Sequence, residues 1–248
     1  YRELLDAQSQ FLADASHQLR TPLAIMLTQA GVALREKDPQ QMRTTLRAMV
    51  VQLERSRRLS EQLLSLAHAS EQAPADEEID RVDLNAIARE AVLQHLTLAH
   101  EKEQDLGWID AREADAVEAG PEDAAAPLAV PVRASAPQLH EALANLVHNA
   151  IVHTPRGGRI TVRVYVEGAQ AHAEVSDDGP GIEGARRDEV FGRFRQVAPG
   201  NGKRSSGSGL GLAIARAYAR RNGGDIVLAD AEPGTTGLRA ILRLPLAG

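Results

Sequence analysis

The sequence contains no cysteine among its 248 residues. Disulfides and thiolate metal sites are therefore excluded, and the composition fits a reducing compartment. Aromatic residues make up only 3% of the chain, whereas hydrophobic residues as a whole make up 43%. We therefore expect a core of Leu, Val, Ile and Ala, in one large or two modest domains.

Long apolar runs and an excess of positive charge are also missing. No hydrophobic run reaches the length of a membrane span, and no signal peptide is visible. The formal net charge is −6, which argues against nucleic-acid binding as the main activity. The chain starts inside a helical pattern without a helix-start signal, so we expect it to be a fragment of a longer protein.

An apolar heptad repeat marks the beginning of the chain. Its members are Leu5, Leu12, Leu19, Met26 and Ala33. A seven-residue apolar repeat makes a seam that faces a partner helix. His17 falls on the side away from this seam, so its imidazole is expected in water. A single exposed histidine is usually plain surface, and only the rest of the chain gives this one a role.

Two helices are predicted before residue 70, spanning residues 2–35 and 39–69. Asp38 is the expected N-cap of the second helix, with Pro39 at its first position. The apolar positions of that helix include Leu46, Met49, Val50, Leu53, Leu59, Leu63 and Leu66. A single hairpin cannot bury such a stripe, whereas two hairpins paired in a four-helix bundle can, so we expect a homodimer.

A change of composition divides the chain. Residues 71–80 are acidic and Ala-rich and are predicted to link a domain of residues 1–70 to one of residues 81–248. In the second domain the patterns predict helices over 84–100, 137–153 and 210–221. They predict strands over 106–109, 130–133, 159–166, 171–176, 225–229 and 238–244, and a loop insertion over 111–127. We expect an α+β domain, a mixed sheet with helices on one face, and Trp108 in its packing.

Two clusters in the second domain favour a site for a nucleotide and a metal ion. Asn145 and Asn149 lie one helical turn apart, and amide oxygens suit a hard cation such as Mg²⁺. Asp177 ends a strand and can accept a hydrogen bond from an exocyclic amine such as that of adenine. Gly179 and Gly181 follow it and allow close backbone approach. Taken singly, these clusters also fit a polar helix face and an ordinary turn.

Two further clusters favour phosphate binding. Phe191-Gly192-Arg193-Phe194-Arg195 combines aromatic anchors with cations, although a basic surface loop has the same composition. Gly207-Ser208-Gly209-Leu210-Gly211 opens a helix, whose free N–H groups can bind phosphate. A Rossmann site is disfavoured because no strand leads directly into these glycines.

The order and spacing of these clusters resemble the N, G1, F and G2 boxes of the histidine-kinase ATP-binding domain, which belongs to the GHKL superfamily. Residues 11–24, FLADASHQLRTPLA, resemble the phosphoacceptor box of two-component sensor histidine kinases. The resemblance covers nearly the whole chain, and the wording ASHQLRTPLA is similar to that of tricarboxylate-type sensors. It implies a multidomain protein, in which an all-α hairpin forms a dimeric four-helix bundle ahead of an α+β sandwich of the GHKL (Bergerat) fold.

The resemblance also implies roles for residues of the phosphoacceptor helix. His17 would accept the γ-phosphoryl group of ATP and pass it to an aspartate of a response regulator that docks on the bundle. Gln18 would orient the imidazole, and Thr21 would orient a water that removes phosphate from the regulator. The parent protein would lie in a bacterial inner membrane, with this portion in the cytoplasm and no role for nucleic acid.

In the ATP-binding domain, the resemblance makes Asn149 the ligand of Mg²⁺ and Asn145 its support. Asp177 would hold the adenine amine in a pocket shaped by Gly179 and Gly181. Arg193 would reach the γ-phosphate or the phosphoacceptor helix. The residues expected to wrap the phosphates are Gly207, Gly209, Leu210 and Gly211.

Two departures from the family pattern leave alternatives open. Gln18 stands where many members have Glu or Asp, and Val152 stands where many have a phosphate-binding Lys, for which Arg156 or Arg193 could substitute. One alternative is a catalytically weakened nucleotide-binding dimer scaffold. Another is a GHKL ATPase without histidine phosphorylation, although that class has a carboxylate at the position of Asn145 and no use for His17.

Overall fold

The structure is a computed structural model that describes residues 2–70, 79–110, 129–195, 207–231 and 236–247. The chain divides into two compact units, residues 1–68 and residues 69–248. Most of the predicted linker, 71–80, and the whole of the predicted loop insertion, 111–127, lie outside the described residues. None of the described helices is long and apolar enough to cross a membrane.

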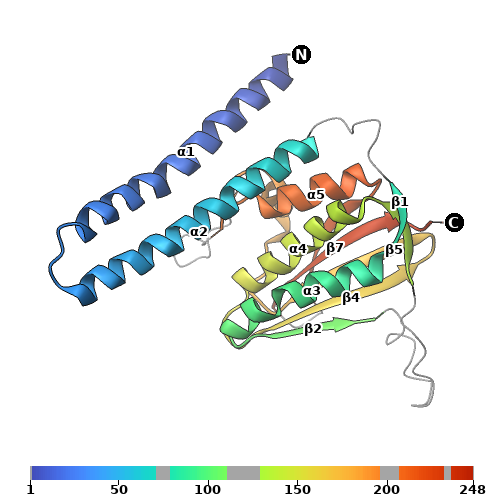
Figure 1. Ribbon diagram of the computed structural model, residues 1–248. Coiled ribbons are helices and arrows are strands. Elements are labelled where there is room, and N and C mark those ends of the chain that lie inside the picture. Colours follow the sequence, from blue (N-terminus) through green and yellow to red (C-terminus); the bar gives the residue numbers. More distant parts are fainter. Residues whose placement is uncertain (1, 71–78, 111–128, 196–206, 232–235, 248) are drawn as a thin grey trace. The chain divides into compact units, whose positions relative to one another are not determined.

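The first unit is a helical hairpin of α1 (Arg2–Ala33) and α2 (Pro39–Ser70), which run side by side in opposite directions (Figure 1). The carboxylate of Asp38 accepts a hydrogen bond from the backbone N–H of Gln40 at 2.9 Å, which confirms the predicted cap. α1 continues through Pro22 as one helix.

Only part of the apolar surface of this hairpin is covered within one chain. Met26 and Ala33, two members of the heptad repeat, are buried, and so are Leu59 and Leu66 of α2. Several other large apolar residues are exposed, among them Leu23, Leu27, Leu34, Leu46, Val50, Leu53 and Leu64. The hairpin therefore carries apolar surface that its own two helices do not bury.

The second unit is built on a five-stranded sheet in the order β2-β4-β5-β7-β6. Its strands are β2 (Asp105–Ile109), β4 (Arg159–Glu167), β5 (Gln170–Asp177), β6 (Asp225–Asp230) and β7 (Leu238–Pro245). β2 pairs with β4 in parallel and the other neighbours are antiparallel, which confirms the predicted mixed sheet.

A separate two-stranded ribbon joins β1 (Asp80–Asp83) to β3 (Pro131–Ala134). The first of these strands was not predicted, because Asp80-Arg81-Val82-Asp83 carries a single apolar side chain. Its extended conformation is stabilised by a partner strand far away in the sequence, which local patterns do not reveal.

Three helices cover one face of the five-stranded sheet (Figure 1): α3 (Leu84–Glu101), α4 (Ala136–His153) and α5 (Gly211–Arg221). Alternate residues of β4, Ile160, Val162 and Val164, are fully buried beneath them. Trp108 is partly buried and lies opposite Val162 in the sheet register, as its predicted packing role requires. This alternation is the period-two signature of a half-buried strand.

Two helix ends of the second unit use standard capping residues. Asp83 caps α3 by accepting the N–H of Asn85 at 3.0 Å, and Gly223, with φ +77°, ends α5 in the left-handed conformation. α4 begins at Ala136, and Ser135 makes no side-chain cap bond there. Two short 3₁₀ turns, η2 (Gly184–Arg186) and η3 (Glu189–Phe191), lie between β5 and α5.

The C-terminal end of α4 is held by two side chains from the turn after α3. Lys102 Nζ donates to the carbonyls of Ile151, Val152 and Thr154 at 2.5, 3.2 and 2.9 Å. Gln104 Nε2 donates to the carbonyls of Ile151 and Thr154 at 3.1 and 2.8 Å. Burial lowers the pKa of Lys102, yet its charge faces the negative end of the helix dipole.

Removing the ammonium of Lys102 should destabilise the second unit. Lys102→Met leaves partly buried carbonyls at the end of α4 with fewer donors, so we expect a loss of about 1–3 kcal/mol in the free energy of unfolding. Urea denaturation followed by the fluorescence of Trp108 measures it, since this is the only tryptophan. The exposed Lys37→Met is the matched control, and equal midpoints for the two variants would contradict the capping role.

Candidate functional site

The first turn of α5 lies directly against α4. A Cβ atom built on Gly211 would come within 2.9 Å of both Nδ2 and Oδ1 of Asn149, and within 3.3 Å of Oδ1 of Asn145. Real Cβ atoms almost never approach other atoms that closely, so any side chain at position 211 would displace the amide of Asn149. The fold thus brings together two clusters that the sequence analysis identified separately.

The amide of Asn145 is held in one orientation. Its Nδ2 donates to the backbone carbonyl of Glu141 at 2.9 Å and to the Glu141 carboxylate at 3.2 Å, and the residue is only 8% exposed. The amide oxygen is therefore left on the side of Gly211. Amide oxygens of Asn145 and Asn149, beside a helix start that can bind phosphate, fit a Mg²⁺ ion coordinated mainly by phosphate and water.

Asp177 lies at the end of β5 in a turn rich in glycine. Its Oδ1 accepts the N–H of Gly179 at 2.9 Å. Burial raises the pKa of Asp177 to about 6, although backbone N–H groups of Gly179 and Leu238 oppose that rise. A partly buried carboxyl that keeps some acceptor capacity suits the exocyclic amine of a purine.

The backbone packs closely around this carboxyl. Gly181, at φ +71°, would place a Cβ 2.9 Å from the carbonyl oxygen of Gly237. Gly237, at φ +139°, would place one 1.9 Å from the carbonyl oxygen of Asp177. The sequence analysis missed Gly237, and the only local signal is a glycine directly before the last strand.

The segment Phe191–Arg195, called the F segment below, contacts the turn that opens α5. A Cβ on Gly209, which has φ +71°, would lie 2.7 Å from the carbonyl carbon of Phe194 and 2.9 Å from the N of Arg195. Phe194 itself has φ +58°, which costs a bulky residue about 1–3 kcal/mol. Arg193 is exposed between these contacts and the 3₁₀ turn η3.

The remaining residues of the phosphate-binding turn have distinct positions. Leu210 is fully buried and anchors the turn beneath α5, and its N–H donates to the hydroxyl of Ser208 at 3.2 Å. Gly207 is exposed. The structure thus groups Asn145, Asn149, Gly209, Leu210 and Gly211 around the meeting point of α4 and α5.

Arg156, one of the two predicted substitutes for the lysine missing at Val152, is engaged elsewhere. Its guanidinium pairs with the carboxylate of Glu103 at 2.6 and 3.0 Å and also donates to the carbonyl of Glu101. Of the two predicted substitutes, Arg193 is the one that the F segment carries next to the start of α5.

In the first unit, His17 is exposed on α1, as its heptad position predicts, and Gln18 beside it is exposed too. The hydroxyl of Thr21 donates to the carbonyl of His17 at 3.3 Å. An apolar groove of about 630 Å³ runs along the same helix and is lined by Ser16, Leu19, Arg20, Leu23, Ala24 and Leu27.

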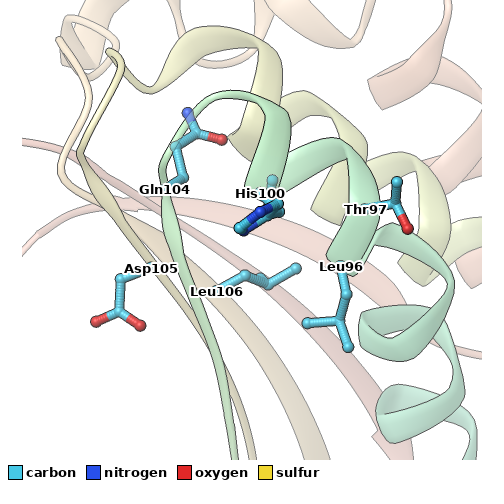
Figure 2. Close-up of a pocket in the computed structure, with 7 residues that line it drawn as sticks. Leu96, Thr97, His100, Gln104, Asp105 and Leu106 are labelled. Carbon is cyan, nitrogen blue, oxygen red and sulfur yellow. The ribbon is translucent and has the colours of Figure 1, made fainter.

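A second hollow of about 460 Å³ lies between the end of α3 and β2 (Figure 2). It is lined by Leu96, Thr97, Ala99, His100, Gln104, Asp105 and Leu106. None of the residues predicted to bind ATP belongs to this lining, so it is distinct from the candidate site.

Comparison with known families finds two matching domains. Residues 7–72 match the His Kinase A (phospho-acceptor) domain. Residues 134–248 match the domain described as histidine kinase-, DNA gyrase B- and HSP90-like ATPase. The first match contains His17 and the second contains every predicted ATP-binding residue.

Two similar proteins are named as sensors. The chain is 34% identical over 240 residues to the probable sensor histidine kinase TcrY of Mycobacterium tuberculosis, covering 96% of this chain and 46% of that protein. It is 34% identical over 226 residues to the sensor protein IrlS of Burkholderia pseudomallei, covering 91% and 44%. The chain thus spans about half the length of these curated relatives.

A solved structure shares the fold. The histidine kinase ThkA, determined in complex with the response regulator protein TrrA, superimposes with a TM-score of 0.72 over 99% of this chain and 64% of that one, at 21% identity. The hairpin followed by an α+β domain, predicted from the sequence, is confirmed by this likeness and by the family matches.

The contact at Gly211 predicts a variant that loses binding but keeps its fold. In Gly211→Ala the new methyl group displaces the side chain of Asn149, and affinity for Mg-ATP should fall about 10- to 100-fold. The helix propensity of alanine should keep the free energy of unfolding within about 1 kcal/mol. Calorimetric titration measures the Mg-ATP affinity of this variant and of the control Gly184→Ala, whose new Cβ meets no atom within 4 Å. Unchanged affinity in Gly211→Ala would refute the assignment.

The raised pKa of Asp177 predicts a pH dependence. The ionised carboxylate is the acceptor, so adenine-nucleotide affinity should fall as the pH drops through about 6. Asp177→Asn should weaken binding about tenfold or more at pH 7.5. The titration of the nucleotide phosphates affects wild-type protein and Asp177→Asn equally, so it cancels in the ratio of their affinities. This ratio should fall towards one as the pH is lowered.

The neighbouring exposed Asp178→Asn is the control for this experiment, since Asp178 accepts the N–H of Arg159 instead. Burial raises the pKa of Asp177 in the folded protein above that of an exposed aspartate, so ionised Asp177 opposes folding at pH 7. Asp177→Asn should therefore not lower the stability of the free protein. A pH-independent ratio would show that Asp177 does not contact the base.

Proposed function

Because this chain belongs to the sensor histidine kinases, carrying their phospho-acceptor and ATP-binding domains, we propose that it transfers the γ-phosphoryl group of Mg-ATP to His17 and then to an aspartate of a response regulator. The observation that supports this most strongly is the convergence of Asn145, Asn149 and Gly211 in the ATP-binding domain. An exposed imidazole on the phospho-acceptor helix completes the pair of reactants.

The chemistry requires little more than positioning and charge compensation. The neutral imidazole of His17 attacks the γ-phosphorus in line, the bond to the β-phosphate oxygen breaks, and ADP leaves. Mg²⁺, held by Asn149 with Asn145 in support, would neutralise charge on the phosphates. Gln18 can accept the Nδ1–H of the imidazole and so present Nε2, but as an amide it takes no proton at pH 7.

Asp177 and the glycines around it would select adenine, and the start of α5 with Arg193 would hold the phosphates. The pKa of Asp177, about 6, keeps the carboxyl mostly ionised at neutral pH, as an acceptor for the exocyclic amine must be. Thr21, one turn after His17, is proposed to orient the water that dephosphorylates the regulator. Its hydroxyl lies on the same helix and already bonds the His17 carbonyl.

We further propose that the chain acts as a homodimer and docks a response regulator on its helical bundle. The apolar residues that α1 and α2 leave exposed, including Leu27 at 78%, support pairing of two hairpins. The structure of ThkA with TrrA shows that a protein of this fold binds a response regulator. The dimer would form through residues 1–70, joined by 71–80 to the ATP-binding domain of 81–248.

We also propose that this chain is the cytoplasmic portion of a bacterial inner-membrane protein, as the family resemblance implies. The chain matches its relatives over about half of their length. The rival reading as an ATPase without histidine phosphorylation has less support. Its expected carboxylate position is occupied by Asn145, and the nearby Glu141 carboxylate bonds the amide of that same residue.

Labelling with γ-phosphate tests the proposal. Wild-type protein incubated with Mg²⁺ and γ-labelled ATP should acquire an acid-labile, base-stable label. His17→Gln should abolish the label while ATP affinity stays within about twofold, because the two functions lie in separate units. His68→Gln, a helical histidine of the same hairpin, is the matched control.

Each rival predicts a different result in this assay. Acid-labile label in His17→Gln would show that His17 is not the acceptor. If wild-type protein releases phosphate from ATP but acquires no label, the result would favour an ATPase without histidine phosphorylation. ATP binding with neither label nor release would favour the catalytically weakened scaffold.

A further inference from the structure

Arg216, in the middle of α5, lies over an aromatic ring of the F segment. Its guanidinium carbon is 4.2 Å from the ring centroid of Phe191. A cation at this distance is attracted by the ring quadrupole, and more strongly where water is partly excluded. The Arg216 side chain is only 23% exposed, and Phe191 is half-buried.

Arg216 is itself held in place by a carboxylate. Its Nε donates to Oδ1 of Asp225 at 2.7 Å and its Nη2 donates to Oδ2 at 3.1 Å. A two-bond fork fixes the plane of the guanidinium as well as its position. Hydrogen bonds from Arg216, and secondarily from Arg220, hold the pKa of Asp225 well below its usual range, so this anchor stays charged at neutral pH.

The other end of the F segment is held by the turn before the same helix. Gly209 packs against the backbone of Phe194 and Arg195, and Phe194 is kept at φ +58°. A left-handed phenylalanine persists only where its surroundings determine it. The F segment is thus fixed at Phe191 by α5 and at Phe194 by the turn that opens α5, and Arg193 lies between these two points.

We propose that Arg216 is a positioning residue of the nucleotide site: through Phe191 it sets where the F segment holds Arg193 relative to the phosphate-binding start of α5. This inference rests on the proposed function, in which Arg193 serves the γ-phosphate. The simpler role would be an ion pair that ties α5 to β6 and has no effect on the nucleotide.

Arg220 separates these two roles. It pairs with the same carboxylate, through Nε to Oδ1 of Asp225 at 3.3 Å and Nη2 to Oδ2 at 3.2 Å. Among the described residues, the guanidinium that stacks on the ring of Phe191 is that of Arg216, not that of Arg220. Arg220→Met therefore removes an arginine from Asp225 but leaves the contact on the F segment in place.

The experiment compares ATP with ADP, because only ATP carries the γ-phosphate. In the full chain with Mg²⁺, Arg216→Met should weaken ATP binding about three- to tenfold and ADP binding less than about twofold. Arg220→Met should change both affinities less than about twofold. A purely structural ion pair would move ATP and ADP together, and similarly in both variants.

A double-mutant cycle adds a second readout. Phe191→Leu should reproduce the selective loss of ATP affinity, and the double variant with Arg216→Met should be no worse than either single one. Arg216→Lys keeps a cation but not the two-bond fork, so it should retain part of the preference for ATP over ADP. If Arg216→Met fails to fold, Arg216→Lys replaces it in the comparison. Additive losses, or an unchanged ratio of ATP to ADP affinity in Arg216→Met and Arg216→Lys, would overturn the proposal.

The result also distinguishes failure of this inference from failure of the proposed function. If wild-type protein binds ATP but never labels His17, a selective loss in Arg216→Met still supports the positioning role. If wild-type protein labels His17 and the arginine variants keep their ATP preference, only the positioning role is wrong.

Discussion

The candidate site depends on one close approach, that of the first turn of α5 to α4 at Gly211. Without a side chain there, the helix start can lie against the amides of Asn145 and Asn149. The two helices are also joined at the other end of α4. Asn222, at the end of α5, accepts the N–H of Ser135 at 2.8 Å and donates to Gln138 at 2.9 Å. Lys102 ties the C-terminal carbonyls of α4 to the turn after α3.

Two aspartates show how the same side chain serves different purposes in this domain. Burial raises the pKa of Asp177 to about 6, and its carboxyl is ready to accept a hydrogen bond. Asp225 faces Arg216 and Arg220, which lower its pKa and commit it to fixing the position of α5 and, through Phe191, of the F segment. The first is expected to touch the ligand, and the second organises what touches it.

Local patterns predicted the features that depend on neighbours in the sequence. The heptad placed His17 in water, Asp38 was recognised as a cap, and a strand was expected over 159–166, where Ile160, Val162 and Val164 are buried. Features that depend on distant partners escaped. β1 forms only because β3 pairs with it, and Gly237 matters only because the carbonyl of Asp177 lies where its side chain would be.

The resemblance to the family indicated which residues belong to the site, but the structure shows what holds them there. The contacts of Gly209 with Phe194 and of Arg216 with Phe191 join elements separated along the chain, and Glu141 orients Asn145 from one turn away on the same helix. The roles of the predicted residues in binding and transfer follow from chemistry and stay predictions until a ligand is placed.

A crystal structure of this chain with Mg²⁺ and a non-hydrolysable ATP analogue tests the central claim most directly. The account predicts the purine amine on the carboxylate of Asp177, the metal on the amide oxygen of Asn149, and the phosphates at the start of α5. A nucleotide bound elsewhere, for example in the hollow between α3 and β2, or one bound with Asn149 and Asp177 out of contact, would contradict it.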